Sequence, residues 1–144
     1  MSRIKINLPK KFVFKTMLNV HIGDINYGGH MGNDAYLRFA HEARLQFLKA
    51  QGWSEMDLDG LALIMTDAAI QFQAEVFHGE VLTIEIALAE VSKKGFEIYY
   101  KITSNDGQKQ IASIKTGMYF FDYNKKRLAE AKVNTVQRLL AFCI

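Results

Sequence analysis

The fold of this 144-residue chain is decided by one stretch, residues 33–52, which reads NDAYLRFAHEARLQFLKAQG. Apolar side chains recur there at spacings of three and four residues, the period of an α-helix with one buried face. They are Tyr36, Phe39, Ala40, Ala43, Phe47 and Ala50, and the polar residues Arg38, Glu42, Gln46 and Lys49 fall largely off this stripe. Asn33 or Asp34 supplies an N-cap and Gly52 a stop. The stretch therefore predicts one long amphipathic helix.

The sequence on both sides of this helix favours β-strands. Residues 10–22 read as a strand before it, and four segments after it alternate apolar and polar side chains with a period of two. These segments cover about residues 66–76, 82–88, 96–103 and 112–120, and the turn Asn105-Asp106-Gly107 joins the last two as a hairpin. Residues 130–142 predict a short amphipathic helix whose apolar face is Val133, Val136, Leu139 and Leu140.

This order of elements predicts an α+β fold, with a five-stranded antiparallel sheet and one long helix in a single domain over residues 1–144. One helix cannot cover both faces of such a sheet. The sheet most simply wraps around the helix or buries its other surface in a partner. We therefore expect a homo-oligomer, with a dimer as the commonest case.

Composition excludes several classes of protein. The chain is 49% hydrophobic and 23% charged, too apolar for a disordered protein. No run of residues approaches the roughly 20 apolar residues that a membrane span needs. The one cysteine, Cys143, allows neither an intrachain disulfide nor a cysteine metal cluster, and the first residues do not resemble a signal peptide. We expect a soluble, cytoplasmic protein without a cofactor or metal.

The net charge of +3 is a sum of opposed blocks. Residues 1–23 carry five bases and no acids, residues 24–92 carry three bases and eleven acids, and residues 93–144 carry ten bases and four acids. Two interpretations are open: the basic blocks bind a phosphate-bearing ligand, or they are solvated faces that offset the acidic middle. Nucleic acid is a weaker candidate partner, because the bases are scattered rather than clustered with aromatic residues.

The chemistry is concentrated in the loop before the helix, which reads DINYGGHMGNDAYL over residues 24–37. It brings together acids, amides, one imidazole and three glycines at the entrance of an apolar helix. Glycines let the backbone approach a ligand closely, and free N–H groups at a helix N-terminus stabilise negative charge that develops on a carbonyl oxygen. These groups suit an acyl-transfer site.

The pattern Asp-x-Asn-x-x-Gly-His, followed by Asn33, Tyr36-Leu37 and Glu42-Ala43-Arg44, resembles hotdog-fold thioesterases of the 4-hydroxybenzoyl-CoA thioesterase type. The resemblance covers roughly residues 12–123 and is most specific over residues 24–44. It implies a sheet that wraps the helix, and two chains that pair edge to edge into a continuous sheet. It also implies an active site at the dimer interface, between the loop of one chain and a strand of the other.

By this resemblance Asp24 takes the first acid of the family's Asp-x-Asp pair, while Asn26 stands where many members have the catalytic Asp. An amide hydrogen-bonds a carbonyl or water but cannot act as a base. His30 and Asn33 match the family's His-x-x-Asn, with the oxyanion-binding N–H expected near Gly29 to Asn33. The sequence candidates for the base are Glu42, Asp34, Asp24 and His30.

Each polar candidate has a structural alternative. Asp24 would cap the backbone of the loop, His30 would hydrogen-bond within a turn, and Asp34 would be a first-turn acid. Glu42 would pair with Arg38 or Lys49. Asp67, on the polar side of its strand, is a candidate at the neighbour's site, and Lys93, Lys94 or Arg127 are candidates for binding nucleotide phosphates.

The leading hypothesis is hydrolysis of an acyl-CoA or acyl-carrier-protein thioester by a homodimer, or by dimers that associate into a homotetramer. Two other functions remain open. One is acyl-CoA binding without turnover, which the amide at Asn26 would suit. The other is dehydration or hydration of 3-hydroxyacyl thioesters, for which His30 would be the base.

Overall fold

The computed structural model describes residues 1–143 and confirms the predicted long helix and five strands. The elements are β1 (Phe14–Asn19), the short 3₁₀ helix η1 (Ile22–Asp24), α1 (Ala35–Ala50), β2 (Ala62–Phe72), β3 (Val81–Ala89), β4 (Gly95–Ser104), β5 (Gln110–Asp122), β6 (Arg127–Leu128) and α2 (Val133–Leu140). The two-residue strand β6, which pairs with the end of β5, was not predicted.

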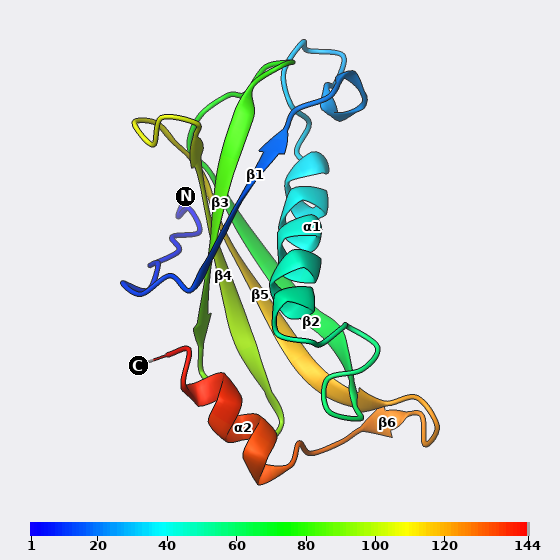
Figure 1. Cartoon of the computed structure of the whole chain (residues 1–144). Helices are drawn as coiled ribbons and strands as arrows, with labels where there is room; N and C mark the ends of the chain where they lie inside the picture. Colours follow the sequence, from blue (N-terminus) through cyan, green and yellow to red (C-terminus); the bar gives the residue numbers. More distant parts are fainter. Residues whose placement is uncertain (144) are drawn as a thin grey trace.

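The strands form one antiparallel sheet in the order β1-β3-β4-β5-β2, which curves around α1 (Figure 1). The predicted turn at residues 105–107 joins β4 to β5, and Gly107 adopts the positive φ of 74° that this turn requires. The architecture is the one expected from the sequence, with the helix lying in the concave face of the sheet.

The core lies between α1 and this concave face. As the period of two predicts, alternate residues of the central strands, such as Ile84, Ile98 and Ile114, are fully buried there. From the helix side Tyr36, Phe39, Ala40, Ala43, Phe47 and Leu48 are buried against them. The last residue of the predicted stripe, Ala50, is instead exposed, because the helix ends at that residue.

The end of α1 is set by Gly52. Its N–H donates to the Lys49 carbonyl, and the Trp53 N–H donates to the Leu48 carbonyl. This pair of bonds is a Schellman motif, and it needs a residue at positive φ, which Gly52 supplies at 81°. The predicted stop is thus confirmed.

Strand β2 begins and ends about four residues earlier than predicted. A bulge between Met65 and Asp67 changes which side chains face the helix, so that Leu63 and Met65 as well as Ile70 and Phe72 lie on the concave side. After Phe72 the chain leaves the strand, since the Gln73 and Ala74 N–H groups both donate to the Ile111 carbonyl.

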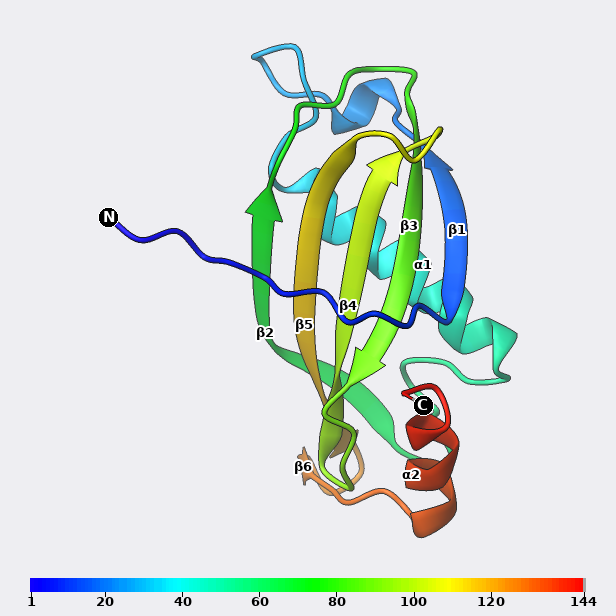
Figure 2. The same ribbon diagram turned by 90° about the vertical axis from the view of Figure 1, so that its left-hand side faces the viewer.

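The convex face of the sheet is crossed by the N-terminal segment, residues 1–13 (Figure 2). The Ile6 N–H donates to the Gln71 side chain, and the Lys101 ammonium lies 5.6 Å from the centroid of the Phe12 ring. Strand β1 is likewise shorter than predicted, because residues 10–13 belong to this crossing segment. One edge of β2 pairs with β5, and the other edge has no strand partner within residues 1–143.

The predicted apolar face of the C-terminal helix is wrong in part. Val133 and Leu140 are exposed, whereas Thr135 and Leu139 are buried. The reason is a polar anchor, because the Thr135 hydroxyl and the Trp53 indole N–H both donate to the carboxylate of Asp59, at 2.7 and 3.0 Å. Arg138 lies over the Trp53 ring, 4.1 Å from its centroid. Neither helix of residues 1–143 is long and apolar enough to cross a membrane.

The docking of α2 through Asp59 should make the stability of the protein depend on pH. The Thr135 hydroxyl, then the Trp53 N–H and Arg138, lower the pKa of Asp59 in the folded protein. Because the pKa of Asp59 is lower in the folded protein, its ionised carboxylate stabilises the fold fully above the unfolded carboxyl pKa of about 3.9. This stabilisation is lost as the pH falls through the pKa of Asp59 in the folded protein. Asp59→Asn should therefore be less stable at pH 7, and its deficit should shrink below about pH 4.

Urea unfolding of both proteins at several pH values measures this. The expected deficit at pH 7 is about 1–2 kcal/mol, as for the loss of a hydrogen-bonded charge. Asn tolerates the positive φ of 55° at this position, so the comparison isolates the charge. A deficit that is the same at pH 7 and pH 3.5 would contradict this account of the anchor.

Candidate active site

The loop before α1 is closed on itself by backbone hydrogen bonds. The Asn26 N–H donates to the His30 carbonyl, the Gly29 N–H to the Asn26 carbonyl, and the Gly32 N–H to the Asp24 carbonyl, all within 3.1 Å. Gly29 has a positive φ of 86°, which a larger residue would adopt only with strain. The glycines found in the sequence thus allow a tight turn with side chains on its rim.

A longer-range bond joins this loop to the segment that follows β2. The Met31 N–H donates to the Val76 carbonyl at 2.7 Å, and both residues are buried. Residues 26–36 and residues 72–75 consequently face one another across a cleft of about 620 Å³. The lining residues are Asn26, Tyr27, His30, Met31, Asn33, Tyr36, Phe72, Gln73, Ala74 and Glu75. We call this the loop cleft.

The beginning of α1 provides backbone donors beside the loop cleft. The helix begins at Ala35, and Asp34 occupies the N-cap position without a capping hydrogen bond from its side chain. The Asn33 backbone N–H has no hydrogen-bond partner among residues 1–143. An N–H of this kind at a helix N-terminus is suited to a carbonyl oxygen or an oxyanion.

Asn26 and His30 lie together on the rim of the loop cleft. The Asn26 side-chain oxygen accepts a hydrogen bond from the Gly28 N–H at 2.9 Å, which leaves its amide NH₂ free to donate. A Cβ atom at Gly28 would lie 3.3 Å from His30 Nε2 and 3.2 Å from the Asn26 oxygen. Gly28 therefore keeps room for both side chains, and Nδ1 of His30 lies 3.4 Å from the Met31 carbonyl.

The two acids of the loop are held by one arginine. Arg38 donates to Asp24 at 3.2 Å and to Asp34 at 3.0 Å, and the other oxygen of Asp24 accepts from the His21 N–H. The hydrogen bond from Arg38 lowers the pKa of the Asp34 carboxyl. These contacts correspond to the structural alternatives for both residues, and neither acid lines the loop cleft.

Glu42 lies on the exposed side of α1. Its carboxylate accepts a hydrogen bond from Gln46 at 2.7 Å, and Gln46 in turn accepts one from the Thr16 hydroxyl. The structural alternative for Glu42 is right in its exposed position but wrong in the partners Arg38 or Lys49, because Gln46 one turn later donates to the carboxylate instead. Within one protomer Glu42 does not line the loop cleft.

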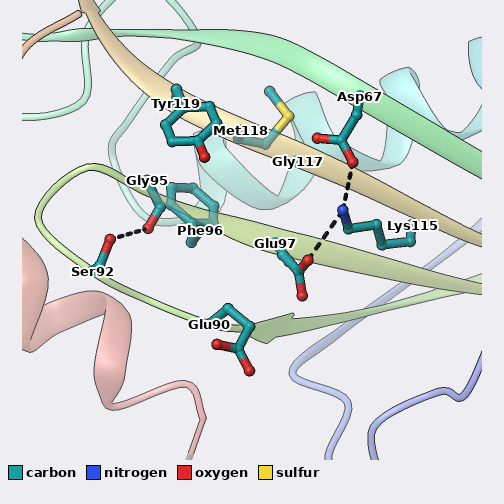
Figure 3. A pocket seen from close by; sticks show the side chains of 10 residues that line it. All are labelled: Asp67, Glu90, Ser92, Gly95, Phe96, Glu97, Lys115, Gly117, Met118 and Tyr119. Atoms are coloured by element: carbon teal, nitrogen blue, oxygen red, sulfur yellow. Dashed lines mark hydrogen bonds and ion pairs between the residues drawn. The ribbon is translucent and has the colours of Figure 1, made fainter.

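Asp67 lies on the convex face, away from α1 (Figure 3). It accepts a hydrogen bond from the Thr66 hydroxyl and pairs with Lys115, which also pairs with Glu97 at 3.1 Å. The bond from Lys115, then the bond from Thr66, lower the pKa of Asp67. A Cβ at Gly117 would collide with this carboxylate, so the glycine makes room for the ion pair. In one protomer Asp67 is therefore remote from the loop cleft.

Lys93 and Lys94 occupy the turn between β3 and β4. Figure 2 shows this turn beside β6, at the opposite end of the sheet from the loop. Lys93 pairs with Glu130 at 3.1 Å, and the Lys94 carbonyl accepts from the Phe120 N–H. One protomer alone does not bring these lysines to the loop cleft. No group of three metal-binding side chains lies close enough to hold an ion among the described residues 1–143.

A second depression, of about 340 Å³, runs between α1 and β2. Its apolar lining includes Leu37, Leu63 and Met65, and its base carries the buried Arg44. Arg44 donates to Glu55 at 2.8 Å and to the Tyr100 hydroxyl at 2.9 Å. We call this depression the helix groove; its exposed surface is mainly apolar, and Arg38, His41, Arg44 and Glu55 are its ionisable lining residues.

One acid of the loop cleft, Glu75, was not predicted from the sequence. The residue sits near the end of a predicted strand, 45 positions after His30, where the alternation assigned it to a polar strand face. The bond between Met31 and Val76, together with the contact between the Tyr36 and Phe72 rings, brings it to the loop. A local pattern carries no signal for such a contact.

Comparison with known proteins agrees with this architecture. The model of the thioesterase-like superfamily matches residues 20–139. A curated relative from Aquifex aeolicus (strain VF5), named "Putative esterase", is 26% identical over 97 residues, which are 66% of this chain and 74% of that protein.

Solved hotdog-type structures share the fold. The 1,4-dihydroxy-2-naphthoyl-CoA thioesterase Slr0204 from Synechocystis has a TM-score of 0.79 at 20% identity, over 89% of this chain and 95% of that one. SAV2348 from Staphylococcus aureus, solved in complex with CoA, has a TM-score of 0.79 at 17% identity, over 96% of this chain and 87% of that one. Because this family match covers residues 20–139 of its 144 residues, the chain belongs to the thioesterase-like superfamily.

Proposed function

We propose that the protein hydrolyses the thioester of an acyl-CoA, or of an acyl carrier protein, to a free acid and a thiol. The observation that carries this proposal is the loop cleft, which polar side chains line and where the Asn33 N–H at the beginning of α1 has no hydrogen-bond partner among residues 1–143. Membership in the thioesterase-like superfamily supports the reaction class. The CoA bound to SAV2348 and the naphthoyl-CoA substrate in the name of Slr0204 support CoA as the thiol.

The catalytic effect rests on the thioester carbonyl. Its oxygen would accept a hydrogen bond from the Asn33 N–H, with the Asn26 amide as a second donor. One preorganised donor of this kind is typically worth about 3–4 kcal/mol in the transition state. Asn26 thus polarises the carbonyl and takes no proton. His30, on the same rim, would orient the attacking water.

The acyl group would lie in the helix groove, since this groove is mainly apolar and runs along α1. Its volume of about 340 Å³ is at the small end of ligand pockets, which suits a compact acyl group. Strand β2 forms one wall of the groove, so a partner chain at the free edge of β2 would close it from outside.

We infer a homodimer that pairs along β2. This edge has no strand partner within residues 1–143, and it presents the half-exposed apolar side chains of Met65 and Phe72. Antiparallel pairing of two β2 strands sets opposite ends of the two sheets side by side. Lys93 and Lys94 of one copy would then approach the loop cleft of the other, where they would bind the phosphates of CoA. The same arrangement would bring Asp67 closer to the neighbour's site.

Association of dimers into a tetramer would use other surfaces, and the convex face is partly covered by residues 1–13. A cytoplasmic location belongs to the same proposal, since acyl-CoA substrates and the free thiol of Cys143 both suit a reducing compartment.

The proposal predicts that the purified protein releases free CoA from acyl-CoAs. A panel of aliphatic and aromatic acyl-CoAs, assayed with a thiol reagent, measures this, and we expect the compact acyl groups to be the better substrates. No thiol release from any member at micromolar enzyme would contradict hydrolysis. Tight acyl-CoA binding by calorimetry in that case would indicate a binding protein, and enoyl-CoA hydration would indicate a hydratase.

The loop cleft predicts which variants lose activity. Asn26→Ala and His30→Ala should each lower kcat/KM by at least about tenfold, because both side chains lie on the rim of the cleft. Glu42→Ala is the matched control, since this side chain faces solvent and its one hydrogen bond within residues 1–143 comes from Gln46. We expect it to stay within about twofold of the wild type. Loss of activity in Glu42→Ala alone would place the site elsewhere.

The dimer predicts a mass of about twice 16.4 kDa by analytical ultracentrifugation. Met65→Glu, on the free strand β2, should shift the equilibrium towards monomer because it places a charge in the apolar contact. Met56→Glu is the control, because Met56 is also an exposed methionine but lies in the loop after α1. A wild-type monomer, or an equal effect of both variants, would contradict pairing along β2.

A further inference from the structure

The loop cleft contains a carboxylate that has no partner among residues 1–143. Glu75 is exposed, lines the cleft, and its side chain makes no hydrogen bond or ion pair with any residue among 1–143. The other acids near the cleft are engaged or remote. Asp24 and Asp34 are held by Arg38, and Glu80 accepts a hydrogen bond from the Phe77 N–H at 2.6 Å. Glu75 is therefore the free acid of this cleft within the described residues.

The backbone that carries Glu75 is fixed on both sides. Before it, the Gln73 and Ala74 N–H groups donate to one carbonyl, that of Ile111, at 2.9 and 3.2 Å. After it, the carbonyl of the fully buried Val76 accepts from the Met31 N–H at 2.7 Å. The Glu75 carbonyl itself accepts from the Lys109 ammonium at 3.3 Å. A base held by such an anchored backbone is placed reproducibly against a bound substrate.

The position of Glu75 is opposite the carbonyl-binding groups. Because Met31 bonds the residue next to Glu75, His30 and Glu75 both adjoin this hydrogen bond, one on each side of the cleft. Tyr36 lies between the two segments, and burial, then the charges of Glu80 and Glu75, raise the pKa of its hydroxyl. The negative charge of Glu75 therefore acts on the hydroxyl of Tyr36, which lines the cleft.

We propose that Glu75 is the general base that activates water for attack on the thioester, in place of the acid missing at Asn26. This role rests on the proposed hydrolase function. The Glu75 carboxylate takes a proton from water as the water oxygen bonds to the carbonyl carbon. The carbonyl electrons move onto its oxygen, which the Asn33 N–H stabilises. Collapse of this intermediate breaks the C–S bond, and the departing thiolate receives the proton from Glu75.

Atoms and charge balance in this cycle, because one water and one thioester give an acid and a thiol and Glu75 returns to its carboxylate. It needs no metal and no covalent enzyme intermediate. It also explains how an amide at position 26 is compatible with turnover. The amide donates a hydrogen bond on one side of the carbonyl, and the proton transfer takes place on the other side.

The test is Glu75→Gln, assayed on the best substrate of the acyl-CoA panel. We expect kcat to fall by about 100-fold or more, the usual effect of removing a general base, with KM within about threefold. Glu80→Gln is the matched control, because it changes an acid five residues away whose hydrogen bond from Phe77 an amide oxygen preserves. It should keep kcat within about threefold.

Two further readouts separate a base from a structural residue. Formate should restore part of the activity of Glu75→Ala without stimulating the wild type, because a small carboxylate can occupy the vacated place. The acidic limb of the wild-type pH–rate profile should disappear in Glu75→Gln. The titratable and charged groups around this carboxylate are His30, Tyr36, Glu80 and Lys109. The pH–rate profile of His30→Gln is therefore measured in parallel, and we expect it to retain the acidic limb.

The outcomes distinguish this role from the proposed function. Hydrolysis by the wild type together with Glu75→Gln within threefold of its kcat would overturn the role of Glu75 and leave the hydrolase function standing. A wild type without hydrolysis on any substrate would overturn both. Circular dichroism and thermal unfolding should match between the variant and the wild type, since this side chain is exposed and has no partner among residues 1–143. Glu75→Asp should retain partial activity, and if it matches Glu75→Gln instead, the carboxylate is not the base.

Discussion

The candidate site depends on one backbone hydrogen bond, from the Met31 N–H to the Val76 carbonyl. It connects the glycine-rich loop before α1 with the segment that leaves β2, two parts of the chain 45 residues apart. Both residues are buried, so an unmade bond would leave a donor and an acceptor without water, at a cost of about 1–3 kcal/mol for each group. The bond therefore holds two walls of a cleft at a fixed separation.

The rest of the molecule supports this bond. The concave sheet and the buried stripe of α1 fix where the helix begins, and hence where the Asn33 N–H lies. Arg38 holds both loop acids and keeps the loop against the first turn of α1. The glycines at positions 28 and 29 give the loop its tight path and leave room for Asn26 and His30. Fold and site are thus positioned by the same contacts.

The sheet, the helix and the loop were predictable from the sequence because they depend on local order. The period of two in residues 82–120 and the stripe ending near Gly52 both follow from which side chains are buried. The bulge near Thr66 was not predictable, since no glycine or proline marks it, and it changes which side chains of β2 face the helix. The face of α2 was predicted wrongly, because an anchor at Asp59 outweighs the apolarity of Val133.

Long-range contacts account for what the sequence did not reveal of the site. Four acids and bases near the motif were candidates by position, and in the structure two of them, Asp24 and Asp34, form ion pairs with Arg38, while Glu42 faces solvent. Glu75 had no motif around it. The opposed charge blocks show the same effect, since Lys115 pairs with Asp67 and Arg138 with Asp59, which joins the basic end to the acidic middle.

In the proposed reaction an acyl thioester binds in the loop cleft with its carbonyl at the beginning of α1. A crystal structure with an acyl-CoA analogue in which a methylene replaces the thioester sulfur tests this directly. The account predicts the carbonyl oxygen within hydrogen-bond distance of the Asn33 N–H, with Glu75 on the other side of the carbonyl carbon and room for one water between them. An analogue bound with its carbonyl outside the loop cleft, for example beside Asp67 on the convex face, would contradict it.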